Sequence, residues 1–527
     1  MYSYILLQLS GKMKTKISLI EVPEVKVSYE SGGREEVYSA VRTNYPKQSQ
    51  LITAGFLRDL GDVKIVDMKI RDSNREELYK QFPYGDGKIK CYKKGASFES
   101  LENIVKDSDI IGLTSNFTRS AGLVIDFIEY AKKINSKAKI VLGGSDATPR
   151  YEYYLRNGAD IVILGEGESI GPKVIQAISK SRPLDDLSGI AYKDGDAIKY
   201  NPRNSLTDKV NVNDIPLPAF DLVGSDLEKY TEAFEGPLPS NVKTPVGILE
   251  TSRGCAEACP FCTTPSLRKG YRHMSTERIE ELIKHYKKFG IETLILMEDN
   301  ILSRLTLPNG REKVIEMFNL LKQNGFAWEF GNGLEIGKLM NNNRIDEELI
   351  EKMFYHDAQD GKYIGAYRVY TPLESLHQEP NKVYKKLRPY DQELEIIKAM
   401  ASTRIPMMTF GTIIGRPNND DKASLKLTEE RCLEIKKIVE EKGVQTYFTP
   451  FLNILLPGTP DYKKYKHVLK YDIEEYPELY HFHTATLKTK DFTPAELTVF
   501  KREMEERING SEARKVWGST GKYYFKK

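Results

Sequence analysis

The amino-acid sequence predicts an α/β protein, with two successive units of parallel sheet and helix followed by a small, mainly helical C-terminal region. Three observations lead to this fold class. Short apolar runs typical of buried strands alternate with helical stretches along most of the 527 residues. Residues 205–243, rich in Pro, Asn, Asp and Ser, interrupt the alternation and indicate a linker. After Leu456 the alternation ends, which predicts a separate region, 456–527.

The first unit, residues 13–204, is predicted to be a doubly wound (Rossmann-like) sheet. Strand-like runs occur at 17–22, 63–67, 109–114, 138–142 and 160–164. Ligands of such sheets bind at the carboxyl ends of the strands, where small residues and hydroxyls let a large flat ligand lie close to the backbone. The candidate residues are Thr114, Ser115, Asn116, Gly143, Gly144, Ser145, Gly165, Glu166, Gly167 and Glu168. A flavodoxin-like domain without ligand, or with a nucleotide, is the alternative, although no short Gly-rich nucleotide motif is present.

The second unit, residues 244–455, is predicted to be a partial (β/α)6 barrel of the TIM type, with six strands and five intervening helices. It opens with a strand at 246–251, a helix at 276–289 capped by Ser275, and a strand at 292–297. Further strands follow near 327–333, 363–370, 406–414 and 444–453. Sites in such barrels lie at the C-terminal ends of the strands. We therefore look there for functional residues.

The C-terminal region carries a cluster of aromatic and histidine side chains. Its members are Tyr476, Tyr480, His481, Phe482 and His483. Such a cluster could border a substrate pocket, but it is more often the packing face of a small lid. Residues 456–527 are therefore predicted to form a lid or substrate domain.

The overall composition is that of an ordinary globular protein, with 40% hydrophobic and 29% charged residues. A net charge of +3 gives no reason to expect a nucleic-acid partner. No apolar run approaches the length of a membrane span. The apolar N-terminus has its lysines after it, which is the wrong order for a secretory signal. We expect a cytoplasmic monomer with reduced thiols, in which residues 1–12 are dispensable and Met13 is the natural start.

Three of the five cysteines, Cys255, Cys259 and Cys262, fall within eight residues directly after the first barrel strand. Thiolates gathered this closely suit iron or zinc. A cubane 4Fe-4S cluster normally takes four cysteines, so three would leave one iron open to bind a further ligand. The alternatives are a structural zinc site closed by His273 and a disulfide. Zinc folds usually show two paired ligand sets, and no secretory context favours a disulfide.

The spacing Cys-x3-Cys-x2-Cys, with Phe261 before the last cysteine, resembles the signature of the radical S-adenosylmethionine (SAM) enzymes. In that family the open iron chelates SAM, and its reductive cleavage gives a 5′-deoxyadenosyl radical. The resemblance implies a 4Fe-4S cluster, SAM, a small-molecule substrate and an electron donor such as flavodoxin or ferredoxin. The SAM-binding residues that it implies are Phe261, Glu298, Asp299, Asn300, Glu374, Ser375, Gly411, Ile413 and Gly415.

These residues end successive barrel strands, and the resemblance gives each group a part of SAM. Glu298-Asp-Asn300 matches the position that holds the amino group, and Glu374 matches a carboxylate that binds the ribose. Gly411-x-Ile-x-Gly415 matches a pattern whose backbone lies beside adenine, because glycine permits close approach. The family often has a glutamate three positions further on, where this chain has Asn418.

The first unit resembles the cobalamin-binding domain that precedes the barrel in one branch of these enzymes. Gly143-Gly-x-x-Ala147, Gly165-Glu-Gly-Glu168 and the later stretch 187–221 carry this resemblance. It implies that the ten strand-end residues of the first unit bind cobalamin. The first 272 residues contain no histidine, so this domain has no imidazole to offer to the lower face of cobalt. Loss of that axial ligand would change the redox potential and methyl-transfer reactivity of the metal.

The resemblance as a whole implies a cobalamin-dependent radical SAM methyltransferase. Its target would be an unactivated carbon, or a phosphinate phosphorus, of a small molecule or natural-product intermediate. One alternative is an oxidoreductase, cyclase or rearrangement enzyme without net methyl transfer, and another is a non-enzymatic metal or cobalamin sensor. Methylthio transfer needs a further cluster, for which Cys91 and Cys432 are too few and too far apart.

Overall fold

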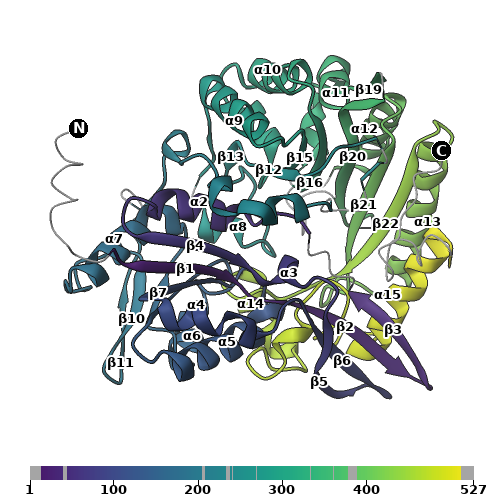
Figure 1. The fold of residues 1–527 in the computed structure, drawn as a ribbon. Coiled ribbons are helices and arrows are strands. Elements are labelled where there is room, and N and C mark those ends of the chain that lie inside the picture. The colour runs from purple at the N-terminus through teal and green to yellow at the C-terminus, as the bar shows by residue number, and fades with distance from the viewer. Residues whose placement is uncertain are drawn as a thin grey trace.

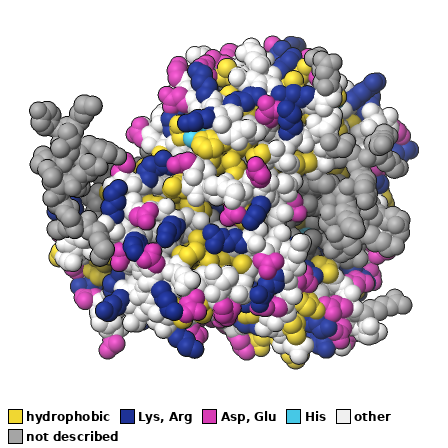
Figure 2. Space-filling view, viewed as in Figure 1, with side chains coloured by type: hydrophobic (Ala, Val, Ile, Leu, Met, Phe, Trp, Pro, Cys, Tyr) yellow, Lys and Arg dark blue, Asp and Glu magenta, His cyan; other side chains and the backbone are white. Residues whose placement is uncertain are grey.

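A computed structural model describes most of the chain. The described residues are 14–39, 44–204, 208–232, 238–239, 241–268, 270–332, 334–359, 361–377 and 388–511. The prediction that residues 1–12 are dispensable falls outside these ranges. Within them, none of the helices combines the length and the apolar character needed to span a bilayer. Basic and acidic side chains are interspersed over the face seen in Figure 2, as the small net charge leads one to expect.

The first unit is built on a seven-stranded sheet of order β11-β10-β9-β8-β7-β1-β4. Its strands are β1 (Lys16–Glu21), β4 (Asp62–Asp67), β7 (Ile110–Thr114), β8 (Lys139–Gly143), β9 (Ile161–Ile163), β10 (Ile190–Asp194) and β11 (Ala197–Asn201). The first five are parallel and confirm the five predicted strands, whereas β10 and β11 add an antiparallel edge. The sheet runs outwards from β1 in both directions, so β1 and β7 form the switch point at which doubly wound sheets bind ligands.

Helices connect the strands of this sheet. They are α2 (Gln48–Leu57), α3 (Met68–Arg71), α4 (Glu102–Asp107), α5 (Ala121–Ile134), α6 (Tyr151–Arg156) and α7 (Gly167–Ser179). The amphipathic pattern of α5 buries Leu123, Val124, Phe127 and Ile128 against the strands. Figure 1 shows this unit below the second one, with the carboxyl ends of its parallel strands directed towards the middle of the molecule.

A second, four-stranded antiparallel sheet was not predicted. Its order is β3-β2-β6-β5, from β2 (Glu24–Ser31), β3 (Arg34–Ser39), β5 (Glu76–Tyr84) and β6 (Gly87–Lys94). Charged residues alternate with apolar ones in these strands, so they lack the continuous apolar runs of a buried strand. The alternation itself and the glycine-containing turns 32–33 and 85–87 were the available signals.

In the described residues, the second unit is a partial barrel of six parallel strands in chain order, connected by five main helices, which confirms the predicted fold (Figure 1). The strands are β12 (Val246–Leu249), β15 (Thr293–Met297), β16 (Ala327–Asn332), β20 (Lys362–Glu374), β21 (Met407–Ile414) and β22 (Gln445–Leu452). The helices are α9 (Thr276–Lys288), α10 (Gly310–Gln323), α11 (Glu347–Met353), α12 (Tyr390–Ser402) and α13 (Lys422–Glu440). Ser275 caps α9 as predicted, accepting a hydrogen bond from the Arg278 amide at 3.3 Å.

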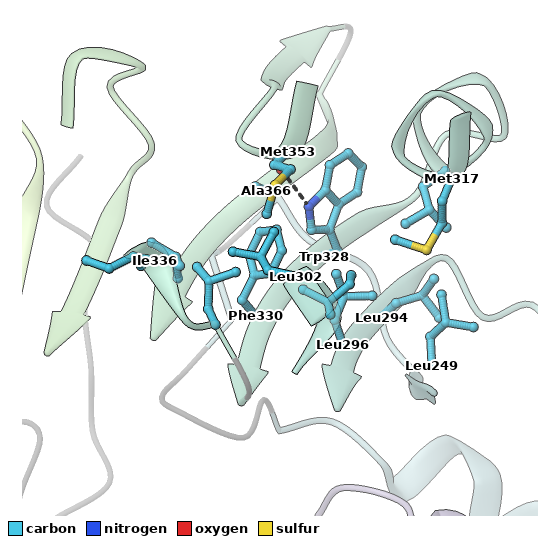
Figure 3. Close-up of a cluster of buried hydrophobic side chains, with 14 of the residues drawn as sticks. Leu249, Leu294, Leu296, Leu302, Met317, Trp328, Phe330, Ile336, Met353 and Ala366 are labelled. Carbon is cyan, nitrogen blue, oxygen red and sulfur yellow. Dashed lines mark hydrogen bonds between the residues drawn. The ribbon is translucent and has the colours of Figure 1, made fainter. Parts of the chain in front are cut away.

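Alternate strand residues face opposite sides of the barrel sheet. On the helix side Trp328 is fully buried among the apolar residues drawn in Figure 3, and its indole N–H donates to the Met353 carbonyl at 3.2 Å. On the other side Ile248 and Ile295 pack against Ile70 of α3 and Tyr230. The inner face of the barrel therefore meets the first unit directly.

The C-terminal region continues from the last barrel strand with α14 (Pro460–Tyr465) and α15 (Pro494–Asn509). Helix α15 begins at a capping box of Thr493 and Glu496 and packs along β22. The Asn509 side chain accepts from the Phe448 amide at 2.8 Å. The helix thereby covers the edge strand of the incomplete barrel, whose backbone groups would otherwise be exposed.

Candidate functional site

The three clustered cysteines lie on the loop between β13 (Ser252–Arg253) and α8 (Thr264–Leu267), immediately after the first barrel strand. Backbone amides donate to two of the sulfurs: Glu257 N–H to Cys255 Sγ and Thr264 N–H to Cys262 Sγ, each at 3.4 Å. None of the three is in a disulfide. Because N–H donors to cysteine sulfur stabilise the thiolate and tune iron–sulfur clusters, this loop has the chemistry of a cluster-binding loop.

A single structural zinc fits this arrangement poorly. In the part of the chain that the structure describes, no three His, Cys, Asp or Glu side chains come close enough to hold one metal ion. Zinc needs its ligands around one point, whereas the thiolates of a cubane bind different irons. The Nδ1 atom of His273, the imidazole considered for zinc, lies 2.9 Å from the Met274 carbonyl. The donor set therefore fits the cluster better.

The residues that end β15 hold the cysteine loop. Asp299 accepts from the Gly254 amide at 2.7 Å and from the Thr264 hydroxyl at 3.1 Å, so one carboxylate connects the two ends of the loop. The Asn300 side-chain amide donates to Cys255 Sγ at 3.7 Å. Ser303, which the sequence did not single out, accepts from the Ala256 amide at 3.2 Å. Two of the three predicted residues are thus in direct contact with the loop.

Glu298 lies beneath the loop and is only 2% exposed. Its carboxylate accepts hydrogen bonds from the Thr251 amide at 3.0 Å, from the Thr251 hydroxyl and from the Ser252 hydroxyl. Burial raises the pKa of Glu298, against the opposing effects of the Arg304 charge and these hydrogen bonds. In this position Glu298 supports the strand that leads into the loop, and its predicted contact with SAM remains a prediction.

A small cavity lies at the carboxyl ends of β16 and β20, lined by Glu335, Gly337, Glu374 and Arg388 among others. Glu374 is buried in it with a left-handed backbone, φ 53°, a conformation that non-glycine residues adopt mainly at turns and functional sites. Ser375 is buried beside it. Lys338 pairs with Glu335 at 3.4 Å and with Glu257 of the cysteine loop at 2.9 Å. The predicted ribose site and the cluster loop are therefore adjacent.

The glycines of the predicted adenine pattern are needed for packing within the protein. A Cβ atom at position 411 would clash with the Tyr370 hydroxyl, and one at 415 would lie 2.6 Å from Leu497 of α15. Gly415 also has a left-handed backbone, φ 82°. Ile413, between them, is half-buried. Glycine is therefore required at these two positions by packing within the protein, in addition to the predicted close approach of adenine.

A second small cavity lies at the switch point of the first sheet. Thr114 and Asn116 line it together with Glu21, Lys47 and Phe117. Two of the ten predicted cobalamin residues therefore border a cavity where such sheets bind ligands.

Two other residues of the predicted cobalamin-binding set make hydrogen bonds within the protein. Ser115 is fully buried, with its hydroxyl 2.7 Å from that of Tyr154. The Ser145 hydroxyl donates to the Asn116 carbonyl at 2.7 Å, which fixes the loop that follows β8.

Gly143 and Gly144 provide a matched pair for testing this edge of the sheet. A Cβ atom at 143 would have no heavy atom within 4 Å, whereas one at 144 would clash with the Ser115 carbonyl, on a backbone with φ 118°. We expect Gly143→Ala to leave the apoprotein stable but to weaken hydroxocobalamin binding by about 1–3 kcal/mol, which is about five- to 150-fold, if a ligand occupies the open space. Absorbance titration measures this affinity. Gly144→Ala should lower the unfolding temperature instead, and wild-type affinity in Gly143→Ala would contradict the assignment.

The remaining predicted residues, Gly165-Glu-Gly-Glu168, face the cysteine loop. Glu166 forms a two-point ion pair with Arg272 at 2.8 Å, and Glu168 pairs with Arg253 at 2.7 Å. Arg253 directly precedes Gly254-Cys255. No local pattern indicated these arginines, because the paired residues lie more than eighty positions apart in the chain. The carboxyl edge of the first sheet and the cysteine loop of the barrel are therefore in contact.

Family comparisons agree with this two-site arrangement. The B12 binding domain family matches residues 41–175, and the Radical SAM superfamily matches residues 249–428. The chain is a cobalamin-dependent radical SAM enzyme. Membership implies a 4Fe-4S cluster, SAM and cobalamin as cofactors, and an electron donor. The donor sets described above fit all three: cysteine side chains with backbone amide donors, a cavity at the barrel strand ends beside them, and a cavity at the switch point of the first sheet.

Known proteins similar to this radical SAM enzyme cover most of its length. An uncharacterized methyltransferase of Pyrococcus horikoshii, PH0819, is 29% identical over 80% of this chain and 78% of its own. The cytidylyl-2-hydroxyethylphosphonate methyltransferase of Streptomyces wedmorensis is 25% identical over 71% of each chain. The structure of the cobalamin-dependent radical SAM enzyme OxsB superposes with a TM-score of 0.66 at 17% identity, over 93% of this chain and 66% of OxsB. Other relatives are named as methylthiotransferases or as an anaerobic magnesium-protoporphyrin IX monomethyl ester cyclase.

Proposed function

We propose that this chain is a methyltransferase that places a methyl group on an unactivated carbon, or a phosphinate phosphorus, of a small molecule. The observation that carries the proposal is the direct contact between the two cofactor regions, through the pairs of Arg253 and Arg272 with Glu168 and Glu166. When bound, cobalamin would supply the methyl group, and the cluster with SAM would supply the radical that activates the substrate. Both reagents must reach one substrate, which requires the two sites to share an opening.

The relatives support methyl transfer over the alternatives. Two relatives whose alignments cover more than two thirds of both chains are named as methyltransferases, one of them acting on a cytidylyl-linked phosphonate. A hopanoid C-3 methylase is 30% identical over a shorter stretch, 63% of this chain. The cyclase and the methylthiotransferases match smaller shares of this chain, or match it at lower identity. Ring formation or rearrangement without net methyl transfer remains the second candidate.

Exposed aromatic side chains of this protein lie near the carboxyl ends of both sheets. Phe117, at the rim of the switch-point cavity, is 45% exposed, and Phe482 is 46% exposed. Phe482 packs edge-on against Phe451 near the carboxyl end of β22, with ring centroids 5.3 Å apart. Exposed aromatic side chains beside a cofactor region favour a substrate with an apolar part, which they would orient and shield from water.

The test separates methyl transfer from the alternatives before the substrate is known. The protein is reconstituted anaerobically with iron, sulfide and hydroxocobalamin, reduced with dithionite, and given SAM labelled as CD3. We expect S-adenosylhomocysteine in an amount equal to the CD3 recovered on the bound corrin by mass spectrometry. Deoxyadenosine without any CD3 on the corrin would favour a cyclase or rearrangement enzyme. Zinc without iron or corrin would point to a sensor.

A further inference from the structure

Residues Gly165–Glu168, which join β9 to the first residues of α7, contact the start of the cysteine loop. Glu166 is only 6% exposed, and its two oxygens bind Arg272 in a two-point pair, with both distances 2.8 Å. One of these oxygens also lies 3.4 Å from Arg253. Burial alone would raise the pKa of Glu166, but the Arg272 hydrogen bonds and the Arg253 charge outweigh it and lower that pKa. Arg272 and Arg253, beside the cysteine loop, therefore keep the Glu166 carboxylate in its charged form.

Arg253 connects these ion pairs to the cysteines. Its buried guanidinium contacts Glu168 at 2.7 Å and Glu250 at 3.0 Å, besides Glu166. Only Gly254 separates Arg253 from Cys255. A shift of the Arg253 side chain would therefore move the first cysteine.

The first unit also contacts the C-terminal end of the cysteine loop. Arg203, which follows the last strand of the first sheet, donates to the carbonyls of Ser266 and Leu267 at 3.1 and 2.8 Å. Both carbonyls belong to α8, which starts two residues after Cys262. The Arg203 guanidinium packs over Gly165, where a Cβ atom would clash with it. One short region of the first unit thus contacts both ends of the segment that carries all three clustered cysteines.

We propose that Glu166, Glu168 and Arg203 are positioning residues for the iron–sulfur cluster, so that the cobalamin domain sets the geometry of the cluster loop. This assigns Glu166 and Glu168 to the cluster side, away from the cobalamin contact that their sequence motif implies. Buried ion pairs add little net stability compared with apolar packing, but they hold groups in one arrangement when every partner is satisfied. The inference depends on the cofactors alone and holds for methyl transfer and rearrangement alike.

Glu166→Gln in the full-length, reconstituted protein tests the proposal. We expect iron content and hydroxocobalamin affinity to stay within about twofold of wild type, because the segment does not bind the corrin. The electron paramagnetic resonance (EPR) spectrum of the reduced cluster should change, and its titration with SAM should show affinity lowered about tenfold, the effect typical of groups one step removed from a metal site. Glu166→Asp, which keeps the charge, should recover part of this loss. Glu152→Gln, an exposed carboxylate on α6, is the matched control.

Arg203→Lys provides a second variant in case Glu166→Gln does not fold. Lysine keeps the charge but not the planar fork that reaches two carbonyls, so SAM affinity should again fall while hydroxocobalamin affinity holds. The opposite pattern, weakened corrin binding with an unchanged cluster spectrum and SAM affinity, would restore the sequence-based assignment and overturn the proposal. Wild-type values for all three measurements in both variants would overturn it as well.

Discussion

Replacing Cys255 by alanine is expected to abolish reductive cleavage of SAM while leaving cobalamin bound. The three thiolates are the full set of protein ligands that this loop offers, so losing one leaves two irons of a cubane without a protein ligand. The loss should exceed the roughly 10–100-fold cost of altering a group one step removed from a metal site. Iron and sulfide content and 5′-deoxyadenosine formation by mass spectrometry measure the effect, and the corrin count per chain measures the retained site.

Cys432→Ala is the matched control for this variant. Cys432 lies on the buried face of α13, where burial raises the pKa of its thiol and makes it a poor metal ligand. Its replacement should leave iron content and deoxyadenosine formation unchanged. If Cys255→Ala still cleaved SAM at a rate near that of Cys432→Ala, the cluster would have to be held elsewhere in the chain.

Much of the fold could be predicted from the sequence because both main sheets are parallel and covered by helices. Strands such as Ile110–Thr114 and Thr293–Met297 are buried on both faces and therefore read as unbroken apolar runs. The antiparallel sheet that includes Glu24–Ser31 was missed because one of its faces is partly exposed. Its charged residues interrupt the apolar signal.

Only the part of the site that lies where strand ends converge could be predicted from the sequence. Parallel strands bring their carboxyl ends to one edge, which places Asp299 and Asn300 next to the cysteine loop, whereas their predicted contact with SAM stays a prediction. The pairs that join the two units could not be predicted, because Glu166 and Arg272 are 106 positions apart and no local pattern links them. The direction of each side chain could not be predicted either. Glu298 is buried, whereas its neighbour Asp299 is more exposed.

Glu298→Ala is expected to destabilise the barrel strongly and to loosen the cluster loop. It would leave the Thr251 amide and the hydroxyls of Thr251 and Ser252 without their buried acceptor, at about 1–3 kcal/mol for each donor that finds no substitute. Arg304, which donates to the Thr251 carbonyl at 3.2 Å, would lose the nearby negative charge. Denaturant unfolding of the apoprotein and the iron content after reconstitution measure the two effects. Glu312→Ala, on the exposed face of α10, is the control.

Glu298→Gln separates a supporting role from a SAM-binding role at the same position. Because the folded-state pKa of Glu298 is raised, its environment favours the neutral carboxyl more than water does. The stability that this group contributes is full below its unfolded pKa and is lost as pH rises through the folded pKa. A neutral amide keeps an acceptor for Thr251 and removes this pH dependence, so Gln should cost far less stability than Ala at neutral pH. If Glu298 instead held the SAM amino group by its charge, Gln would weaken SAM binding as much as Ala, with unfolding stability close to wild type.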